Sequence, residues 1–126
     1  MPRPVTELER QGSLARAAEL TDAEAAVFMP LYREYRRHVG NVNDELLAVL
    51  NDLARDYRSL TNDRAIGLTR RWLATERSRV ELKERYAERF ATVLSAVKTA
   101  RVMQLENKLD ILQMASAAEM IPLVDI

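Results

Sequence analysis

Apolar residues recur three and four positions apart along most of this 126-residue chain, and that spacing restricts the possible folds severely. It places the apolar side chains on one face of an α-helix, whereas a β-strand would need apolar and polar residues to alternate, a pattern that the chain lacks. Hydrophobic residues make up 48% of the chain and charged residues 30%, as in helices with one apolar stripe and a solvated outer face. The sequence therefore predicts an all-α protein.

The beginning of the chain divides into an arm and a helix. Residues 1–19 are polar and charged and include two prolines, so we expect a flexible arm with at most a short helical turn over Leu14–Glu19. A helix then begins at Leu20-Thr21-Asp22-Ala23-Glu24, where a threonine can cap the first turn and a glutamate can reach back to it. The apolar stripe continues beyond Pro30, so we expect a kink at this proline and not an end.

A turn is expected at Gly40-Asn41-Val42-Asn43, because glycine can end a helix in the left-handed conformation and asparagine can cap the next one. The first helix would thus run to about His38 and a second would span about 44–59. Leu60-Thr61-Asn62-Asp63-Arg64-Ala65 repeats the earlier start signal and opens a long third helix.

A further boundary is expected at Leu94-Ser95-Ala96-Val97, where Ser95 can cap a fourth helix over about 96–118. No strong helix breaker stands here, so a continuous third and fourth helix is the alternative. Pro122 ends the helical pattern, and Ile121–Ile126 is expected to form an extended apolar tail. The whole pattern predicts an elongated antiparallel hairpin or bundle of about four helices, forming one domain over residues 20–126.

The sequence offers no motif for catalysis. There is no cysteine and the only histidine is His38, so the ligands of the usual zinc and di-iron sites are missing. His38 is interpreted as a favourable charge near a helix C-terminus. The three glycines lie far apart and form no phosphate-binding loop. We expect a protein that is not an enzyme and that uses no metal or cofactor.

Charge and hydropathy also limit the expected partners. Nineteen basic and nineteen acidic residues give a net charge of zero, whereas a general nucleic-acid binder carries a basic excess. No apolar run approaches the roughly 20 residues that a membrane-spanning helix needs. The first residues lack the apolar stretch of a signal peptide, so an exported form is expected to have lost its signal peptide. Other proteins are therefore the expected partners.

Two sets of side chains are candidates for binding. The polar segment Lys98–Lys108 is either a solvated helix face or a binding strip or interhelix hydrogen-bond network, in which Arg101, Gln104 and Lys108 share one face. The apolar residues exceed what a few thin helices can bury, so an exposed surface that binds clients is expected, and the alternative is that these residues fill a core or a homodimer interface. The expected contact residues are Trp72, Arg79, Tyr86, Phe90 and Met103.

The two leucine–threonine helix starts look like degenerate LTxxQ boxes of the Spy/CpxP-type periplasmic proteins. A bacterial subgroup of that family is more similar still, through an early Phe28-x-Pro30-Leu31-Tyr32-x-Glu34-Tyr35 pattern and a late Gln104-x-Glu106-Asn107-Lys108-Leu109 pattern. The motif residues that carry the resemblance are Leu20, Thr21, Pro30, Tyr32, Tyr35, Leu60, Thr61, Arg101, Gln104, Glu106 and Pro122.

This resemblance implies a helical hairpin that forms a homodimer in the periplasm. It further implies an ATP-independent chaperone or envelope-stress protein that holds clients on an apolar, arginine-fringed helical surface. The neutral charge of the chain differs from the strongly basic concave face of the Spy-like chaperones. The alternative is a structural or signalling adaptor that binds one specific partner and has no holdase activity.

Overall fold

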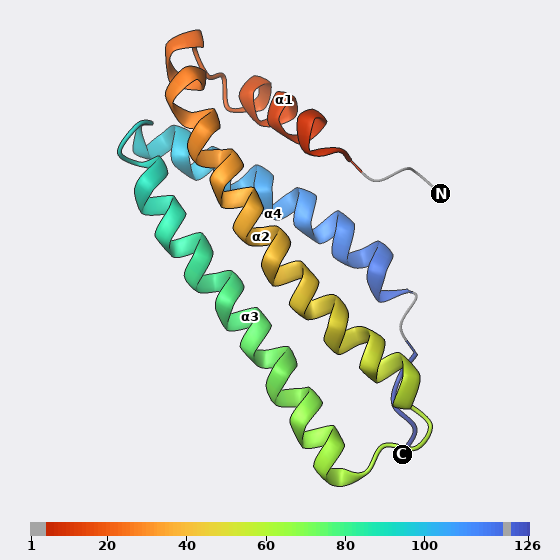
Figure 1. Ribbon diagram of the computed structural model, residues 1–126. Helices are drawn as coiled ribbons and strands as arrows, with labels where there is room; N and C mark the ends of the chain where they lie inside the picture. Colours follow the sequence, from red (N-terminus) through yellow and green to blue (C-terminus); the bar gives the residue numbers. More distant parts are fainter. Residues whose placement is uncertain (1–4, 120–121) are drawn as a thin grey trace.

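The computed structural model describes residues 5–119 and 122–126, which fold into helices without any strand (Figure 1). The all-α prediction is confirmed. The helices are α1 (Glu7–Ala17), α2 (Asp22–Asp56), α3 (Asn62–Phe90) and α4 (Ala96–Ala118). Within the described residues, no helix is at once long enough and apolar enough to cross a membrane.

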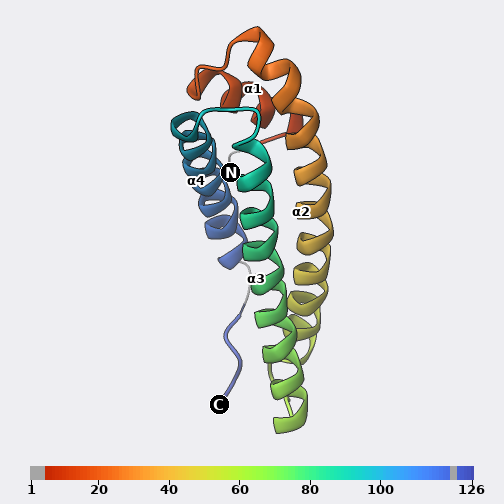
Figure 2. The same ribbon diagram turned by 90° about the vertical axis from the view of Figure 1, so that its left-hand side faces the viewer.

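Helices α2 and α3 form a long antiparallel hairpin, and the two shorter helices cover only one end of it (Figures 1 and 2). Helix α4 runs back along the hairpin from the α3–α4 connection, and α1 lies beside the beginning of α2 and packs on α4. We call this the four-helix end, and the part nearest the α2–α3 connection the two-helix end. The tail returns toward the two-helix end, where the Asp125 N–H donates to the Tyr57 carbonyl over 3.0 Å.

The helix starts expected at Thr21, Thr61 and Ser95 are confirmed. The Thr21 side chain accepts from the Glu24 N–H, and the Glu24 carboxylate accepts from the Thr21 N–H. Thr61 caps α3 by accepting from the Arg64 N–H over 3.2 Å. Ser95 accepts from the Lys98 N–H, and α3 and α4 are separate helices, as favoured by the sequence. These side chains satisfy backbone donors that a helix start leaves unpaired.

The turn expected at residues 40–43 is wrong, because α2 is one helix of 35 residues that continues through both Pro30 and Gly40. Gly40 does not adopt a positive φ. The buried stripe of α2 runs without a break through this segment as Val39, Val42 and Leu46. Burial of that stripe outweighs the cost of about 1 kcal/mol that glycine carries in a helix interior. His38 consequently lies inside a helix and not near its C-terminus.

The flexible arm expected over residues 1–19 is also wrong where the chain is described. Thr6 and Glu9 form a capping box that starts α1, which was not predicted from the sequence. Arg10, Leu14 and Ala18 are buried, so this segment contributes to the fold and is more than a linker. Residues 1–4 lie outside the described part of the chain.

Aromatic rings dominate the core of the four-helix end. The rings of Phe28 and Phe90 meet edge to face at 4.9 Å between centroids, and those of Tyr35 and Tyr86 lie 5.4 Å apart. Such geometries are favourable beyond the burial of apolar area. Tyr32 belongs to the same cluster, and its hydroxyl donates to Glu106, which is part of a group of buried charges next to the apolar core.

Candidate functional site

Glu106 of α4 is the centre of a buried ionic cluster. Its side chain is completely buried, and one carboxylate oxygen accepts both from the Arg10 guanidinium, over 2.6 Å, and from the Tyr32 hydroxyl. The other oxygen accepts from Arg36 over 3.3 Å. Three helices therefore meet at one carboxylate, since Arg10 lies on α1 and the tyrosine and Arg36 lie on α2.

A second layer of charges surrounds this centre and extends it to α3. Asp110 accepts from Arg10 over 3.2 Å and lies 3.7 Å from the Lys83 ammonium. Arg36 also forms a bidentate ion pair with Glu7, in which its Nη2 and Nε donate to the two carboxylate oxygens over 2.9 and 3.0 Å. Fork-like arginine–carboxylate pairs of this kind fix the relative orientation of both side chains. The cluster thus connects all four helices.

The environment of the cluster shifts several pKa values. Burial raises the pKa of Tyr32, and the adjacent Glu106 carboxylate raises it further. Burial alone lowers the pKa of Arg36, but the carboxylates of Glu7 and Glu106 more than offset this, and its pKa is raised. The hydrogen bond from Arg36 lowers the pKa of Glu7. These shifts favour an uncharged tyrosine beside paired arginines and carboxylates, an arrangement that positions helices.

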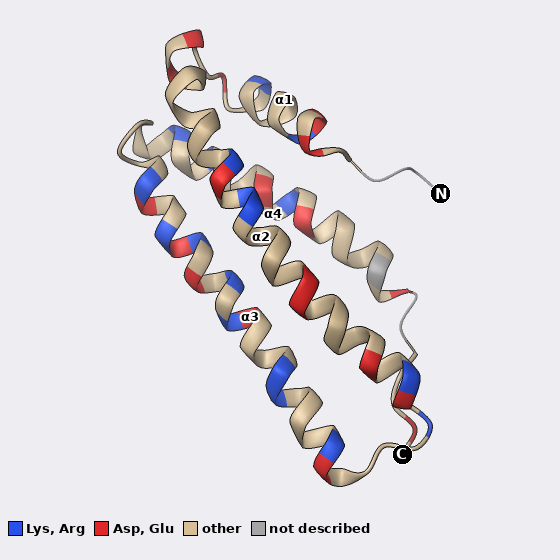
Figure 3. Ribbon diagram, viewed as in Figure 1, with Lys and Arg blue, Asp and Glu red and all other residues tan. Residues whose placement is uncertain are grey.

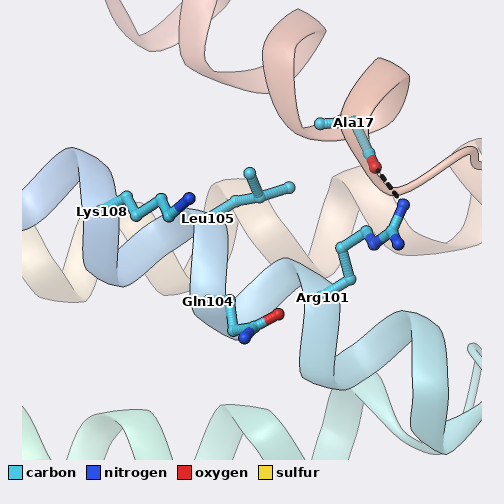
Figure 4. A pocket seen from close by; sticks show the side chains of 5 residues that line it. All are labelled: Ala17, Arg101, Gln104, Leu105 and Lys108. Atoms are coloured by element: carbon cyan, nitrogen blue, oxygen red, sulfur yellow. Dashed lines mark hydrogen bonds between the residues drawn. The ribbon is translucent and has the colours of Figure 1, made fainter.

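A shallow depression of about 240 Å³ lies between α1 and α4 (Figure 4). Arg101 donates across it to the Ala17 carbonyl over 3.2 Å. The sequence placed Arg101, Gln104 and Lys108 on one face, and all three line this depression. Glu106, from the same polar segment, points instead into the buried cluster.

The five expected contact residues do not form one surface. Tyr86 and Phe90 are buried in the aromatic core, so neither ring is presented to a partner in this structure. Met103 is partly buried against the same core. Trp72 and Arg79 are half-buried on α3, where the indole N–H donates to Glu76 over 2.9 Å and the guanidinium donates to Asn43 of α2 over 2.7 Å.

The motif residues fall into four groups. Tyr32, Tyr35 and Glu106, which are distant in sequence, meet in the core and in the buried cluster. The leucine–threonine pairs mark the starts of α2 and α3, and Arg101 and Gln104 line the depression. Pro30 and Pro122 are exposed. The early and late motifs are therefore parts of one structural unit.

An apolar seam that was not predicted from the sequence lies on the outer face of α3. Ile66, Leu73 and Val80 are seven residues apart and are 49%, 50% and 53% exposed. Arg70 and Arg77 are exposed between them, and neither has an ion-pair partner among the described residues. We call these five residues the outer seam. Figure 3 shows the basic positions spread along α3.

The outer seam lies opposite the face by which α3 contacts α2. The buried residues Leu68, Thr75 and Leu82 are also seven apart, two positions later in the chain. Two residues correspond to about 200° around a helix, so the two series lie on opposite sides. The sequence signal was a second seven-residue series, which only the structure distinguishes from the buried one.

Further apolar side chains are exposed on α4 and in the tail. Ile111 and Leu112 are 57% and 67% exposed, and Met114 and Leu123 are also exposed. No group of histidine, aspartate and glutamate side chains in the described residues is arranged to hold a metal ion. The exposed apolar side chains of α3, α4 and the tail are available for contact with another molecule.

Comparison of the chain with family models, with curated proteins and with solved structures gives no match. The resemblance to the Spy/CpxP-type proteins therefore rests on the sequence motifs alone.

Proposed function

We propose that this protein binds other polypeptides as an ATP-independent, chaperone-like holdase, and that the outer seam of α3 is its main contact surface. The observation that carries the proposal is the alternation of Ile66, Leu73 and Val80 with the exposed Arg70 and Arg77. Apolar side chains gain free energy when a client covers them, in rough proportion to the area removed from water. The arginines add hydrogen bonds without requiring one fixed partner.

Three other arginines of α3 are held in ion pairs, unlike Arg70 and Arg77, and this contrast supports the assignment. Arg64 and Arg71 form ion pairs with Asp52, and Arg89 pairs with Glu34. None of the ion pairs formed among the described residues involves Arg70 or Arg77. Their guanidinium groups are therefore available to the carbonyl and carboxylate oxygens of a bound chain.

The distribution of exposed apolar side chains favours clients without a fixed shape. Besides the outer seam, Ile111, Leu112 and Met114 on α4 provide a second apolar surface. An unfolding chain can contact separate patches, and a flexible methionine adapts to different neighbours. The resemblance to the Spy/CpxP-type proteins adds the periplasm as the proposed location and a homodimer as the proposed state.

The test is the aggregation of a thermally unfolding client, followed by light scattering without ATP. We expect suppression at a stoichiometric amount of the protein and its loss in a Leu73→Asn/Val80→Asn variant. The matched control is Val97→Asn, because Val97 is 78% exposed on α4 and lies outside the outer seam. A wild-type protein that does not suppress aggregation, or a seam variant that suppresses it as well as the control, contradicts the proposal.

The regularity of the outer seam favours a second candidate, a specific adaptor. Apolar residues spaced seven apart on an exposed helix are typical of surfaces that pair with another helix. Cross-linking in cells through a photoreactive residue at Arg70 distinguishes the two functions. One dominant cross-linked protein, together with no suppression of aggregation, supports the adaptor, whereas many cross-linked proteins support the holdase.

A further inference from the structure

Helix α1 is attached to the rest of the molecule by one narrow face. Arg10, Leu14 and Ala18 are spaced four residues apart and are 2%, 0% and 2% exposed. Leu8, on another side of the helix, is 78% exposed. This is how an amphipathic peptide helix is held in a groove, with a few anchors at helical spacing.

The surface under α1 has an apolar part and a charged part. Leu14 and Ala18 belong to the same buried cluster as Phe28 and Tyr32 of α2 and Val102 of α4. One turn from Leu14, Arg10 reaches Glu106 and Asp110 of α4. At the start of α1, Glu7 meets Arg36 of α2. The side chains by which this segment contacts α2 and α4 are therefore an acid, an arginine, a leucine and a small residue, in that order along the chain.

Helix α1 is also the element that can leave most easily. It has 11 residues, and an isolated helix of this length is marginally stable in water. It is joined to α2 through Glu19, whose φ of 53° is unfavourable for a residue with a side chain. Local opening of such an element costs less free energy than unfolding of the whole molecule.

We propose that the surface of α2 and α4 beneath α1 is a helix-binding groove, which α1 occupies within its own chain and which accepts a partner helix with the pattern Glu-x-x-Arg-x-x-x-Leu-x-x-x-Ala. This site is separate from the outer seam of α3 and does not depend on the holdase function. The covalently attached helix is present at an effective concentration in the millimolar range, so it excludes a free helix until it is released.

The test compares two charge reversals in the full-length protein. Arg10→Glu places a carboxylate against Glu106 and Asp110, whereas Glu106 keeps its bonds with Tyr32 and Arg36. Arg16→Glu is the matched control, since Arg16 is exposed on the same helix and has no ion-pair partner in the described structure. Hydrogen exchange of the amides of residues 7–17 reports the release of α1.

Binding is measured with a fluorescent peptide of residues 5–20, by anisotropy. We expect the peptide to bind the Arg10→Glu protein at least about tenfold more tightly than the wild type or the Arg16→Glu protein. A peptide that itself carries Arg10→Glu should not bind, and a scrambled peptide controls for non-specific apolar contact. Formation of a complex between the Arg10→Glu protein and the wild type upon mixing would identify the α1 of a second copy as the partner helix, and this result supports the proposal.

Two results overturn the proposal. The first is an Arg10→Glu protein with a released α1 that does not bind the peptide. The second is an α1 that remains as protected in Arg10→Glu as in Arg16→Glu. If Arg10→Glu loses the circular dichroism of the helical fold, Leu14→Asn takes its place, because it removes the apolar anchor and leaves every charge of the cluster unchanged.

Discussion

The two ends of the molecule each contain a carboxylate surrounded by arginines, in very different environments. At the four-helix end Glu106 is completely buried and is bonded by Arg10, Arg36 and the Tyr32 hydroxyl. At the two-helix end Asp52 pairs with Arg55, Arg64 and Arg71, all of which are more than 40% exposed. Carboxylate–guanidinium pairs therefore fix the arrangement of the helices at one end, whereas at the other end they lie on a solvated surface.

The difference follows from how much of the hairpin is covered. Helices α1 and α4 cover the hairpin at the four-helix end (Figures 1 and 2), where Arg10 and Glu106 are buried, and this makes an unpaired charge there very unfavourable. Neither α1 nor α4 covers the two-helix end (Figure 1), so water screens the ion pairs of Asp52 with arginines that are more than 40% exposed. Stability is expected to be concentrated at the first end and binding capacity along the outer seam of α3.

The largest expected effect is that of Glu106→Gln. This change removes the buried negative charge and leaves Arg10 and Arg36 without it, so we expect the free energy of unfolding to fall by about 3–5 kcal/mol. Urea denaturation measures the loss. Glu81→Gln, at an exposed position of α3, is the control and should change the value by less than about 0.5 kcal/mol. Equal losses in the two variants would show that the cluster does not hold the helices.

A second effect of burial at the four-helix end should appear at alkaline pH. Burial raises the pKa of Tyr35. Its contribution to stability is therefore fully present below the ordinary tyrosine pKa of about 10 and is lost as the pH rises above it, where the unfolded chain ionises first. Tyr35→Phe should reduce the alkaline loss of unfolding free energy by up to about 1.4 kcal/mol per pH unit. Urea titrations at pH 9 and 11 give the comparison, and identical losses in the two proteins contradict it.

The helix caps sharpen the comparison at a smaller scale. Thr21 forms a complete capping box at the four-helix end, whereas Thr61 makes one cap bond at the two-helix end. We expect Thr21→Ala to lower the free energy of unfolding by about 1–2 kcal/mol and Thr61→Ala by about 0.5–1 kcal/mol. Thermal unfolding of both variants under the same conditions ranks them, and the reverse order would refute the assignment.

Local signals in the sequence were sufficient for most of the fold. The starts of α2, α3 and α4 follow from Thr21, Thr61 and Ser95, because capping involves residues only three apart. The turn near Gly40 could not be judged locally, since the buried stripe that overrides the glycine depends on α3. Helix α1 carried a capping box, but its stability depends on docking against α4, which the sequence does not display.

The sites were harder to predict than the helices. Glu106 was assigned to a polar segment, for which a solvated face, a binding strip and an interhelix network were the alternatives, and no local sequence signal distinguished them. Its partners lie 70 to 96 residues away in sequence. Similarly, the series Ile66–Leu73–Val80 and Leu68–Thr75–Leu82 have the same spacing. Only the position of α2 decides which of the two is buried.

The smallest effect is expected for Asp52→Asn, the counterpart of Glu106→Gln at the two-helix end. The hydrogen bond from Arg71 lowers the pKa of Asp52, so its stabilising contribution is present above the ordinary aspartate pKa and is lost as the pH falls below it. We expect a loss much smaller than that of Glu106→Gln, because exposed pairs are weak. The loss should shrink further in 1 M NaCl, where the Debye length is about 3 Å, whereas that of Glu106→Gln should hardly change. Urea denaturation at low and high salt measures both variants. A salt-resistant loss at Asp52 as large as that at Glu106 would mean that the two ends are equally protected from water and that something covers the two-helix end in solution.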